Sequence, residues 1–172
     1  MSEIIAGEGT IVPNDVSCHC DLHIEKYCSI ASGLRIVSGQ HPAVAYPDCI
    51  SNFPFKEHGW AEWYPPSKHG GLVDIGSDVW IGEAVAIMDG VVVGHGAVLA
   101  AGAMVVKDVP RYCVVAGNPA KVVKQRFTDD QCDRLCEIAW WDWPRERIEA
   151  WLPSMTNVEE FCRDAPVAEG LR

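Results

Sequence analysis

Apolar residues recur every six positions in the stretch VWIGEAVAIMDGVVVGHGAVLAAGAMVVKDV, which runs from Val79 to Val109. One column of the repeat contains Ile81, Ile87, Val93, Leu99 and Val105. A second column, two positions earlier, contains Val79, Val85, Val91, Ala97 and Ala103. This period matches neither an amphipathic helix nor a simple alternating strand. Two residues separated by one position point to the same face of an extended segment, so each unit predicts a very short strand.

The residues between the apolar pairs predict tight corners. Met88-Asp89-Gly90 and Gly94-His95-Gly96 contain glycine, which suits a turn that needs positive φ. Three hexapeptides would close a triangular coil of 18 residues, and stacked coils would enclose the aliphatic columns. Because an internal repeat of fixed period indicates a solenoid, we predict an all-β solenoid, a parallel β-helix. We expect His95 to be a solvent-facing turn residue.

The same register appears earlier in the chain and is then interrupted. Its apolar positions are Val12, Cys18, Ile24, Ile30 and Ile36. The pattern stops near His41 and resumes at Ile75, and the segment between them is rich in proline and aromatic residues without a period. We interpret residues 41–71 as a loop that protrudes from the regular body. Long loops without regular structure are usually functional.

The pattern becomes helical after Val123. Thr128 and Gln131 form a capping box, T-x-x-Q, at the start of a short predicted helix. Pro144 suits the first turn of a second helix, and Asn157 suits the cap of a third. We therefore divide the chain into a β-helix with an inserted loop (1–127) and a C-terminal helical extension (128–172).

Composition and charge narrow the function classes. The net charge is −10, from 14 basic and 24 acidic residues, which argues against nonspecific binding to nucleic acid or anionic membranes. No run of about 18 apolar residues predicts a membrane span. The N-terminus has no basic start and no long apolar run, so we expect no signal peptide and a cytoplasmic location. The eight cysteines are then interpreted as reduced thiols.

The charge is uneven along the chain. From Lys107 to Arg126 there are five basic residues and one acidic residue, Asp108. A local basic patch suits a small anionic ligand. The alternative is a solvated strand edge, where lysine also blocks pairing with other strands, and charge alone favours that alternative.

Several motifs together resemble the hexapeptide-repeat acyltransferases with a left-handed β-helix, and within them the xenobiotic acetyltransferases. This branch includes type B chloramphenicol and streptogramin acetyltransferases. The motifs are IEKYCSIASGLRI, then His41, NFPF, VWIGEAVAIMDGVVVGHGAVLAAGAMVVKDVP, AGNPAKVVKQRF and WWDWP, which span residues 24–152 with gaps. The resemblance implies left-handed coiling, a homotrimer with active sites between subunits, an acetyl-CoA donor and an acceptor with a hydroxyl group.

His41 matches the catalytic histidine of this family. Transfer of an acetyl group from a thioester to an alcohol needs little help at the leaving group, but the alcohol is a weak nucleophile until its proton is removed. A histidine with a pKa near neutrality suits that task, so His41 is assigned as the general base. A backbone N–H is expected to stabilise the oxyanion.

The resemblance also supplies binding residues. The residues that match coenzyme-binding positions are Trp80, Glu83, Ala101, Val106, Lys107, Lys121 and Lys124. For Trp80, packing in a corner is an equally good reading. Tyr46, Phe53 and Phe55 are assigned to an apolar acceptor pocket, with Trp60 and Trp63 as further candidates; packing of the loop onto a neighbouring subunit is the alternative.

The acceptor and the rival classes stay open. His41 occurs earlier in the chain than is common in the family, and GQHPAV also resembles relatives that O-acetylate saccharides, so a saccharide hydroxyl ranks first. An antibiotic hydroxyl is close behind, and an amine is third.

A γ-class carbonic anhydrase would need three converging histidines, and a noncatalytic trimeric scaffold would need neither His41 nor the lysines. Zinc at Cys18, His19, Cys20 and His23 ranks low, and no metal is expected.

Overall fold

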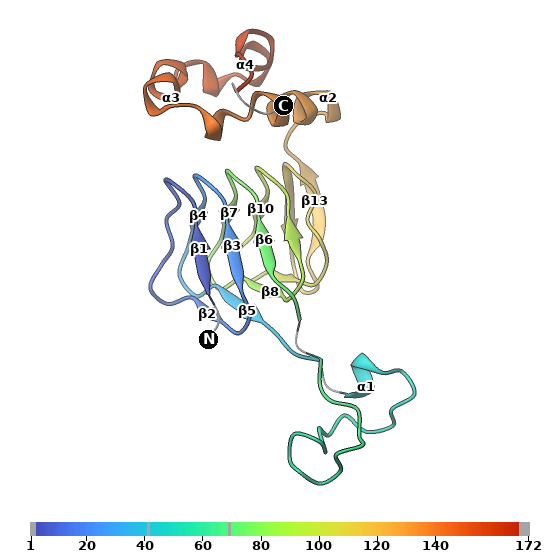
Figure 1. The fold of residues 1–172 in the computed structure, drawn as a ribbon. Coiled ribbons are helices and arrows are strands. Elements are labelled where there is room, and N and C mark those ends of the chain that lie inside the picture. Colours follow the sequence, from blue (N-terminus) through green and yellow to red (C-terminus); the bar gives the residue numbers. More distant parts are fainter. Residues whose placement is uncertain (1–2, 41, 69, 169–172) are drawn as a thin grey trace.

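Short parallel strands arranged in three sheets form the body of the molecule (Figure 1). The structure is a computed structural model and describes residues 3–40, 42–68 and 70–168. Sheet A contains, in spatial order, β1 (Ile4–Ala6), β3 (Leu22–Ile24), β6 (Val73–Ile75) and β9 (Val92–Val93). Sheet B contains β4 (Ser29–Ile30), β7 (Trp80–Ile81), β10 (Val98–Leu99), β12 (Cys113–Ala116) and β13 (Lys121–Gln125). Sheet C contains β2 (Ser17–Cys18), β5 (Arg35–Val37), β8 (Ala86–Met88) and β11 (Met104–Val105).

The register of these sheets follows the predicted length of one coil. Trp80 pairs with Val98, Ala86 pairs with Met104 and Asp74 pairs with Val92, and each of these pairs is 18 residues apart. From β3 to β11 the chain visits sheets A, B and C in turn. All named strand pairs are parallel except β12 with β13, which are antiparallel. The prediction of a mostly β body built from stacked parallel strands, followed by helices, is therefore confirmed.

The apolar columns form the interior of the stack. Ile81, Ile87 and Leu99 are fully buried, and the other members of both predicted columns are buried as well. Burial of one such aliphatic side chain contributes about 1.5–3 kcal/mol, so the columns stabilise every coil. Val12 and Cys18 are only half-buried. They belong to the first coil, which has no further coil packed on its outer side among the described residues.

A loop and a helical extension leave the body on opposite sides (Figure 1). The loop runs between β5 and β6 and contains one helical turn, α1 (Pro42–Ala45). The extension contains α2 (Asp129–Ile138), η1 (Trp140–Asp142), α3 (Arg145–Trp151), η2 (Ser154–Thr156) and α4 (Val158–Asp164). Within the described residues, no helix combines the length and the apolar character needed to cross a membrane.

The helix caps agree with the sequence. The Thr128 side chain accepts from the N–H of Gln131, and the Gln131 side chain accepts from the N–H of Thr128, which completes the capping box. The Asn157 side chain accepts from the N–H groups of Glu159 and Glu160. The extension has an apolar core of its own, which includes Tyr112 from the body together with Trp141 and Trp143. Trp141 stacks on His95 of the body, and Tyr112 belongs to the body itself, so these two side chains tie the helices to the coils.

Candidate functional site

A short antiparallel bridge closes the base of the loop. The N–H of Gln40 donates to the carbonyl of Lys68 at 2.6 Å, and the N–H of Lys68 donates to the carbonyl of Gln40 at 2.9 Å. Gln40 directly precedes His41 in the sequence. His41 itself lies outside the described residues, as does His69. The bridge therefore holds the backbone of the residue that precedes the predicted general base.

Asp89 anchors this base to the body. Its Oδ2 atom accepts a hydrogen bond from the N–H of Gly39 at 3.1 Å. The N–H of Asp89 donates to the carbonyl of Val37 at 2.9 Å. A Cβ atom at Gly70 would lie 2.0 Å from Cγ of Asp89, so a larger residue at the returning end of the loop would force the Asp89 side chain to move. The sequence reasoning missed Asp89, although its corner position in the repeat was an available signal.

Phe53 and Phe55 lie together in an aromatic cluster on the loop. Their ring centroids are 4.9 Å apart, and Trp60 lies 5.5 Å from Phe53 and 5.9 Å from Phe55. Tyr64 contacts Phe55 at 5.0 Å and donates its hydroxyl to the carbonyl of Ser51. The cluster leaves Trp60 74% exposed. The loop therefore presents a preformed aromatic surface.

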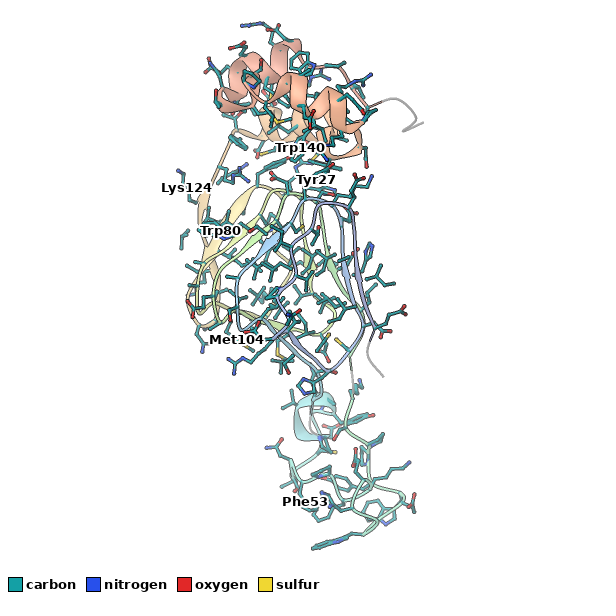
Figure 2. The ribbon with its side chains drawn as sticks, turned by 90° about the vertical axis from the view of Figure 1, so that its left-hand side faces the viewer. Tyr27, Phe53, Trp80, Met104, Lys124 and Trp140 are labelled. Carbon is teal, nitrogen blue, oxygen red and sulfur yellow. The ribbon has the colours of Figure 1, made fainter. Side chains whose placement is uncertain are left out.

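Among the described residues, no ring contact joins Tyr46 to this cluster. Its ring instead lies under the ammonium group of Lys68, with Nζ 5.0 Å from the ring centroid. Because Lys68 also forms the bridge with Gln40, Tyr46 belongs to the base of the loop. Figure 2 shows Phe53 near the far end of the loop, away from Trp80 and Lys124 on the body. Within one chain, Phe53 thus does not meet Trp80 or Lys124.

Glu83 and Ala101 stack at the corner between sheets B and C. The N–H of Gly102 donates to the carbonyl of Glu83 at 2.8 Å, and a Cβ atom at Gly82 would lie 2.6 Å from the backbone nitrogen of Ala101. One level further, the N–H of Met104 donates to the carbonyl of Gly117 at 3.0 Å. The turn that leads to Lys121 therefore continues the same corner.

Lys107 and Val106 lie at a different corner, between sheets C and A. Lys107 follows Val105 by two positions, as Asp89 follows Ile87, and Ile87 pairs with Val105. Lys107 thus occupies the corner that holds the base of the loop, one coil away from Asp89. Val106 and Lys107 are both exposed. Four of the predicted coenzyme residues, Glu83, Ala101, Val106 and Lys107, consequently lie at the two corners on either side of sheet C.

Trp80 and Lys124 lie on sheet B. Trp80 is on β7, and its side chain is 57% exposed in the single chain. Lys121 and Lys124 are on β13, where Lys124 pairs with Val114 and Lys121 pairs with Ala116. Both lysines are exposed. Their ammonium groups are therefore open to an anionic ligand.

Two other members of the basic patch have structural partners. The guanidinium group of Arg111 forms an ion pair with Asp133. Nη1 of Arg126 donates to the carbonyl of Gly96 at 2.6 Å and lies 3.7 Å from Oδ2 of Asp78. The Arg111 ion pair connects the coils with α2 of the extension. The Arg126 contacts connect the end of the body with the corner that contains Gly96 and Asp78. The patch is thus divided between structural arginines and exposed lysines.

The thiols of the first coils are not set up as nucleophiles or as a metal site. Burial raises the pKa of Cys28 to about 11, and burial also raises the pKa values of Cys18 and Cys20. A thiol with a raised pKa carries little thiolate at neutral pH. Nδ1 of His19 lies 3.1 Å from the carbonyl oxygen of Ile36. In residues 3–40, 42–68 and 70–168, no three His, Cys, Asp or Glu side chains gather as metal ligands.

His95 faces solvent only in part, with 34% of its side chain exposed. Its Nδ1 atom accepts from the N–H of Ser77 at 2.9 Å, and its ring stacks on Trp141 at 4.7 Å. Ser77 in turn donates its hydroxyl to Glu25 at 2.7 Å. The reason is that η1 of the extension folds back over this corner, which the repeat pattern alone does not reveal.

Comparisons with known proteins give a consistent picture. A probable macrolide acetyltransferase of Lysinibacillus sphaericus is 41% identical over 156 residues, which cover 86% of this chain and 81% of the relative. The chloramphenicol acetyltransferase of Escherichia coli is 41% identical over 140 residues, 79% of this chain and 66% of the relative. The chain thus spans 66% of the length of that second relative.

A solved structure with a similar fold is that of the polySia specific acetyltransferase NeuO. It is 31% identical, with a TM-score of 0.54, and the match covers 74% of this chain and 56% of that chain. No model of a protein family matches the chain.

Proposed function

Since the chain belongs to the hexapeptide-repeat acetyltransferases, in the branch of the chloramphenicol and macrolide acetyltransferases, we propose that it transfers an acetyl group from acetyl-CoA to a hydroxyl group. The observation that carries this proposal is the 41% identity to a probable macrolide acetyltransferase across 81% of that relative. The arrangement of β body, loop and extension is consistent with it.

In this proposal the coils are left-handed, and three chains assemble around a common axis. The body (1–127) provides the coenzyme groove, the loop (41–71) provides the acceptor surface, and the extension (128–172) packs over the outer corner. Support comes from the separation of Phe53 from Trp80 within one chain, since a neighbouring chain can bring such surfaces together (Figure 2). The exposed rings of Trp60, Trp63 and Trp80 are also typical of surfaces that are covered in an assembly.

His41 acts as the general base. It accepts the proton of the acceptor hydroxyl while the alcohol oxygen attacks the thioester carbonyl carbon. The carbon–sulfur bond then breaks, and the same proton passes to the departing sulfur of coenzyme A. The bridge between Gln40 and Lys68, with Asp89 behind it, fixes the backbone from which His41 extends. No metal is needed in this sequence of steps.

The coenzyme binds along the two corners on either side of sheet C. Glu83 and Ala101 line one corner, and Val106 and Lys107 line the other. Lys121 and Lys124 on β13 attract the phosphate groups, and Trp80 contributes an aromatic wall. The exposure of all three lysines supports this part of the proposal.

The acceptor is an antibiotic hydroxyl or a saccharide hydroxyl. The names of the curated relatives favour an antibiotic, and the aromatic cluster of Phe53, Phe55 and Trp60 suits a large acceptor with an apolar face. A saccharide, which the sequence favours, is supported by the 31% identity to a polySia specific acetyltransferase. Location in the cytoplasm stays a prediction of the sequence.

Release of coenzyme A from acetyl-CoA tests the proposal directly. It is followed by mass spectrometry, because eight cysteines would react with thiol reagents. Wild type and His41→Ala are compared with chloramphenicol, a macrolide, a streptogramin, and pools of sugars and nucleotide sugars. We expect acceptor-dependent turnover that falls at least a hundredfold in His41→Ala. Absence of both turnover and coenzyme binding would support the noncatalytic scaffold instead.

A further inference from the structure

A cavity of about 560 Å³ lies where the outer face of sheet A meets the helical extension. One side is formed by β1, β3 and the corner residues that follow β3, and the other side by α2 and η1. In Figure 1, β1 and β3 lie below the extension. Small-molecule sites typically have volumes of about 300–1,000 Å³. Of the described residues that line this cavity, none is assigned to acetyl transfer, so it is a candidate for a second site.

Glu25 presents to this cavity a carboxylate of which the protein uses only one oxygen. Oε2 accepts a hydrogen bond from the hydroxyl of Ser77 at 2.7 Å, and Ser77 is a buried residue, 1% exposed. Within the part of the chain that the structure describes, Oε1 of Glu25 has no hydrogen-bond partner. The Glu25 side chain is 37% exposed, so a ligand in the cavity can reach it.

Among the described residues of the cavity, none neutralises the charge of Glu25. Nδ1 of His95 lies 3.4 Å from Oε2 of Glu25, but Nδ1 accepts a hydrogen bond from the N–H of Ser77 at 2.9 Å. A ring nitrogen that accepts a hydrogen bond carries no proton, so this contact is not an ion pair. Nζ of Lys26 binds Asp142 instead, at 2.8 Å. Glu25 therefore contributes an uncompensated negative charge.

Two further acceptor atoms accompany Oε1 of Glu25. Oδ1 of Asp142 is used by Lys26, which leaves Oδ2. Nδ1 of His23 donates to Oδ1 of Asp74 at 2.7 Å, so Nε2 of the neutral ring is an acceptor. The side chains of His23 and Asp142 are both more than a third open to solvent at the cavity. The free acceptors and the uncompensated charge together favour a cationic ligand.

The single free oxygen of Glu25 favours one kind of organic cation. A guanidinium group binds a carboxylate best through two parallel hydrogen bonds, one to each oxygen. Here Oε2 already accepts from Ser77 and lies beside Nδ1 of His95, so its approaches are occupied. An ammonium group donates single hydrogen bonds in separate directions, and one of them suffices for Oε1. The geometry therefore favours a primary ammonium group.

Apolar surface lies next to these acceptors. Ile5 pairs with His23 in sheet A, and both side chains point to the outer face because Leu22 and Ile24 point into the core. Ile5 is exposed, and Ala139 lines the cavity from the extension. Covering an exposed isoleucine with an apolar group is favourable. A ligand with a short alkyl chain beside its ammonium group would use this surface.

We propose that this cavity binds a primary alkylammonium ion, with the ammonium group on Oε1 of Glu25 and the alkyl chain along Ile5 and Ala139. The ammonium group compensates the charge of Glu25, and the hydroxyl of Ser77 holds the carboxylate in place for this contact. The site is separate from the proposed transfer of acetyl groups and does not depend on it.

Three probes with the same five-carbon chain test the site on the full chain. n-Pentylamine carries an ammonium group, n-pentylguanidine carries a planar cation, and 1-pentanol is uncharged. Dissociation constants are measured by NMR titration at low salt and about pH 8, where histidine is neutral and the amine is charged. We expect n-pentylamine to bind wild type about fivefold more tightly than 1-pentanol, and more tightly than n-pentylguanidine.

Variants of Glu25 and Ile5 separate the charge from the apolar surface. Glu25→Gln removes the charge and keeps an oxygen that can accept from Ser77. In this variant n-pentylamine is expected to lose about fivefold in affinity, whereas 1-pentanol binds as it does to wild type. Ile5→Ser, at an exposed position, is expected to weaken n-pentylamine and 1-pentanol by the same factor. Glu149→Gln, which removes an exposed carboxylate from α3, is the control and is expected to change neither.

Three results would overturn the proposal. The first is that n-pentylamine does not bind wild type. The second is that Glu25→Gln has no effect or that Glu149→Gln causes an equal loss, because cations would then be attracted only by the net charge of −10. The third is that n-pentylguanidine binds more tightly than n-pentylamine. Circular dichroism of each variant verifies that it is folded, and Ile5→Ser tests the site with the Ser77–Glu25 contact intact.

Discussion

Asp89 accepts a hydrogen bond from the N–H of Gly39, two residues before His41, with an Oδ2–N distance of 3.1 Å. The two residues are 50 positions apart in the sequence, and the loop begins between them. Asp89 belongs to the rigid stack of coils, whereas Gly39 leads into the loop. The contact therefore ties the start of the loop to the coils.

Replacement of Asp89 by alanine is expected to lower turnover more than coenzyme affinity. Loss of the bond to Gly39 frees the base of the loop, and a misplacement of about 1 Å at a reacting group costs up to about a hundredfold in rate. We expect the rate of coenzyme A release in Asp89→Ala to fall about tenfold or more, with little change in the dissociation constant for acetyl-CoA. Steady-state kinetics and calorimetry separate the two quantities.

Asp15→Ala is the matched control for this prediction. Oδ2 of Asp15 accepts from the N–H of Gly33 at 3.0 Å, so the variant loses the same kind of bond at another corner. It is expected to keep wild-type turnover. Equal losses in the two variants would show that Asp89 acts through general stability and not through the position of the loop.

Val92 and Val93 test the register of the coils. Val93 faces the interior and is 1% exposed, whereas its neighbour Val92 is 49% exposed. Val93→Ala removes two buried methyl groups and leaves a small cavity, so we expect a loss of about 2 kcal/mol in the free energy of unfolding. Val92→Ala is expected to cost less than about 0.5 kcal/mol. Urea denaturation followed by circular dichroism measures both, and similar losses would contradict the register.

The interior of the coils and the ends of the helices could be predicted from the sequence because both depend on neighbours in the chain. The six-residue period directly determines which side chains enter the stack, as the burial of Ile81 and Ile87 shows. A capping box joins Thr128 with Gln131, three residues apart, so its chemistry can be recognised without any fold. The loop was recognised as a break in the period.

The contacts of His95, Asp89 and Tyr112 could not be predicted in this way. His95 meets Trp141 only because the extension folds back over its corner. The repeat predicts the coils, but it does not predict where a helical segment beyond the last coil will pack. The partners of Asp89 depend on the path by which the loop returns at Gly70. Such contacts are determined by tertiary packing, and a local pattern carries no information about them.

The unpartnered hydroxyl of Tyr112 is expected to reduce the stability of the folded protein. Tyr112→Phe should therefore raise the free energy of unfolding at pH 8 by about 1 kcal/mol. Burial raises the pKa of Tyr112 in the folded protein, whereas the unfolded chain titrates near pH 10. Above about pH 10 only the unfolded state loses this proton, so stability falls by about 1.4 kcal/mol per pH unit, and Tyr112→Phe removes that contribution. Urea denaturation of both proteins across this range gives the difference.

Tyr64→Phe is the control, because its expected change in the free energy of unfolding is opposite in direction to that of Tyr112→Phe. The Tyr64 hydroxyl has a partner, the carbonyl of Ser51 at 3.0 Å, so its removal is expected to cost stability or to leave it unchanged at pH 8. A decrease of similar size in Tyr112→Phe would mean that its hydroxyl has a partner in solution.

Lys124 is expected to contribute to coenzyme affinity through charge alone. Its exposed ammonium group on β13 matches a family position that meets a phosphate group, and an exposed ion pair of this kind contributes up to about 1 kcal/mol. Lys124→Gln should therefore weaken binding of coenzyme A about fivefold at low salt, less at high salt, and leave turnover at saturation unchanged. Dephospho-coenzyme A, which lacks the 3′-phosphate, distinguishes the partner: if Lys124 meets that phosphate, the variant and wild type bind this analogue equally. Arg145→Gln, which removes an exposed charge from α3, is expected to have no effect on either ligand. If Lys124→Gln lowers the affinity for both coenzyme A and dephospho-coenzyme A, the lysine meets the diphosphate. If the affinity for neither ligand changes, Lys124 does not belong to the coenzyme site.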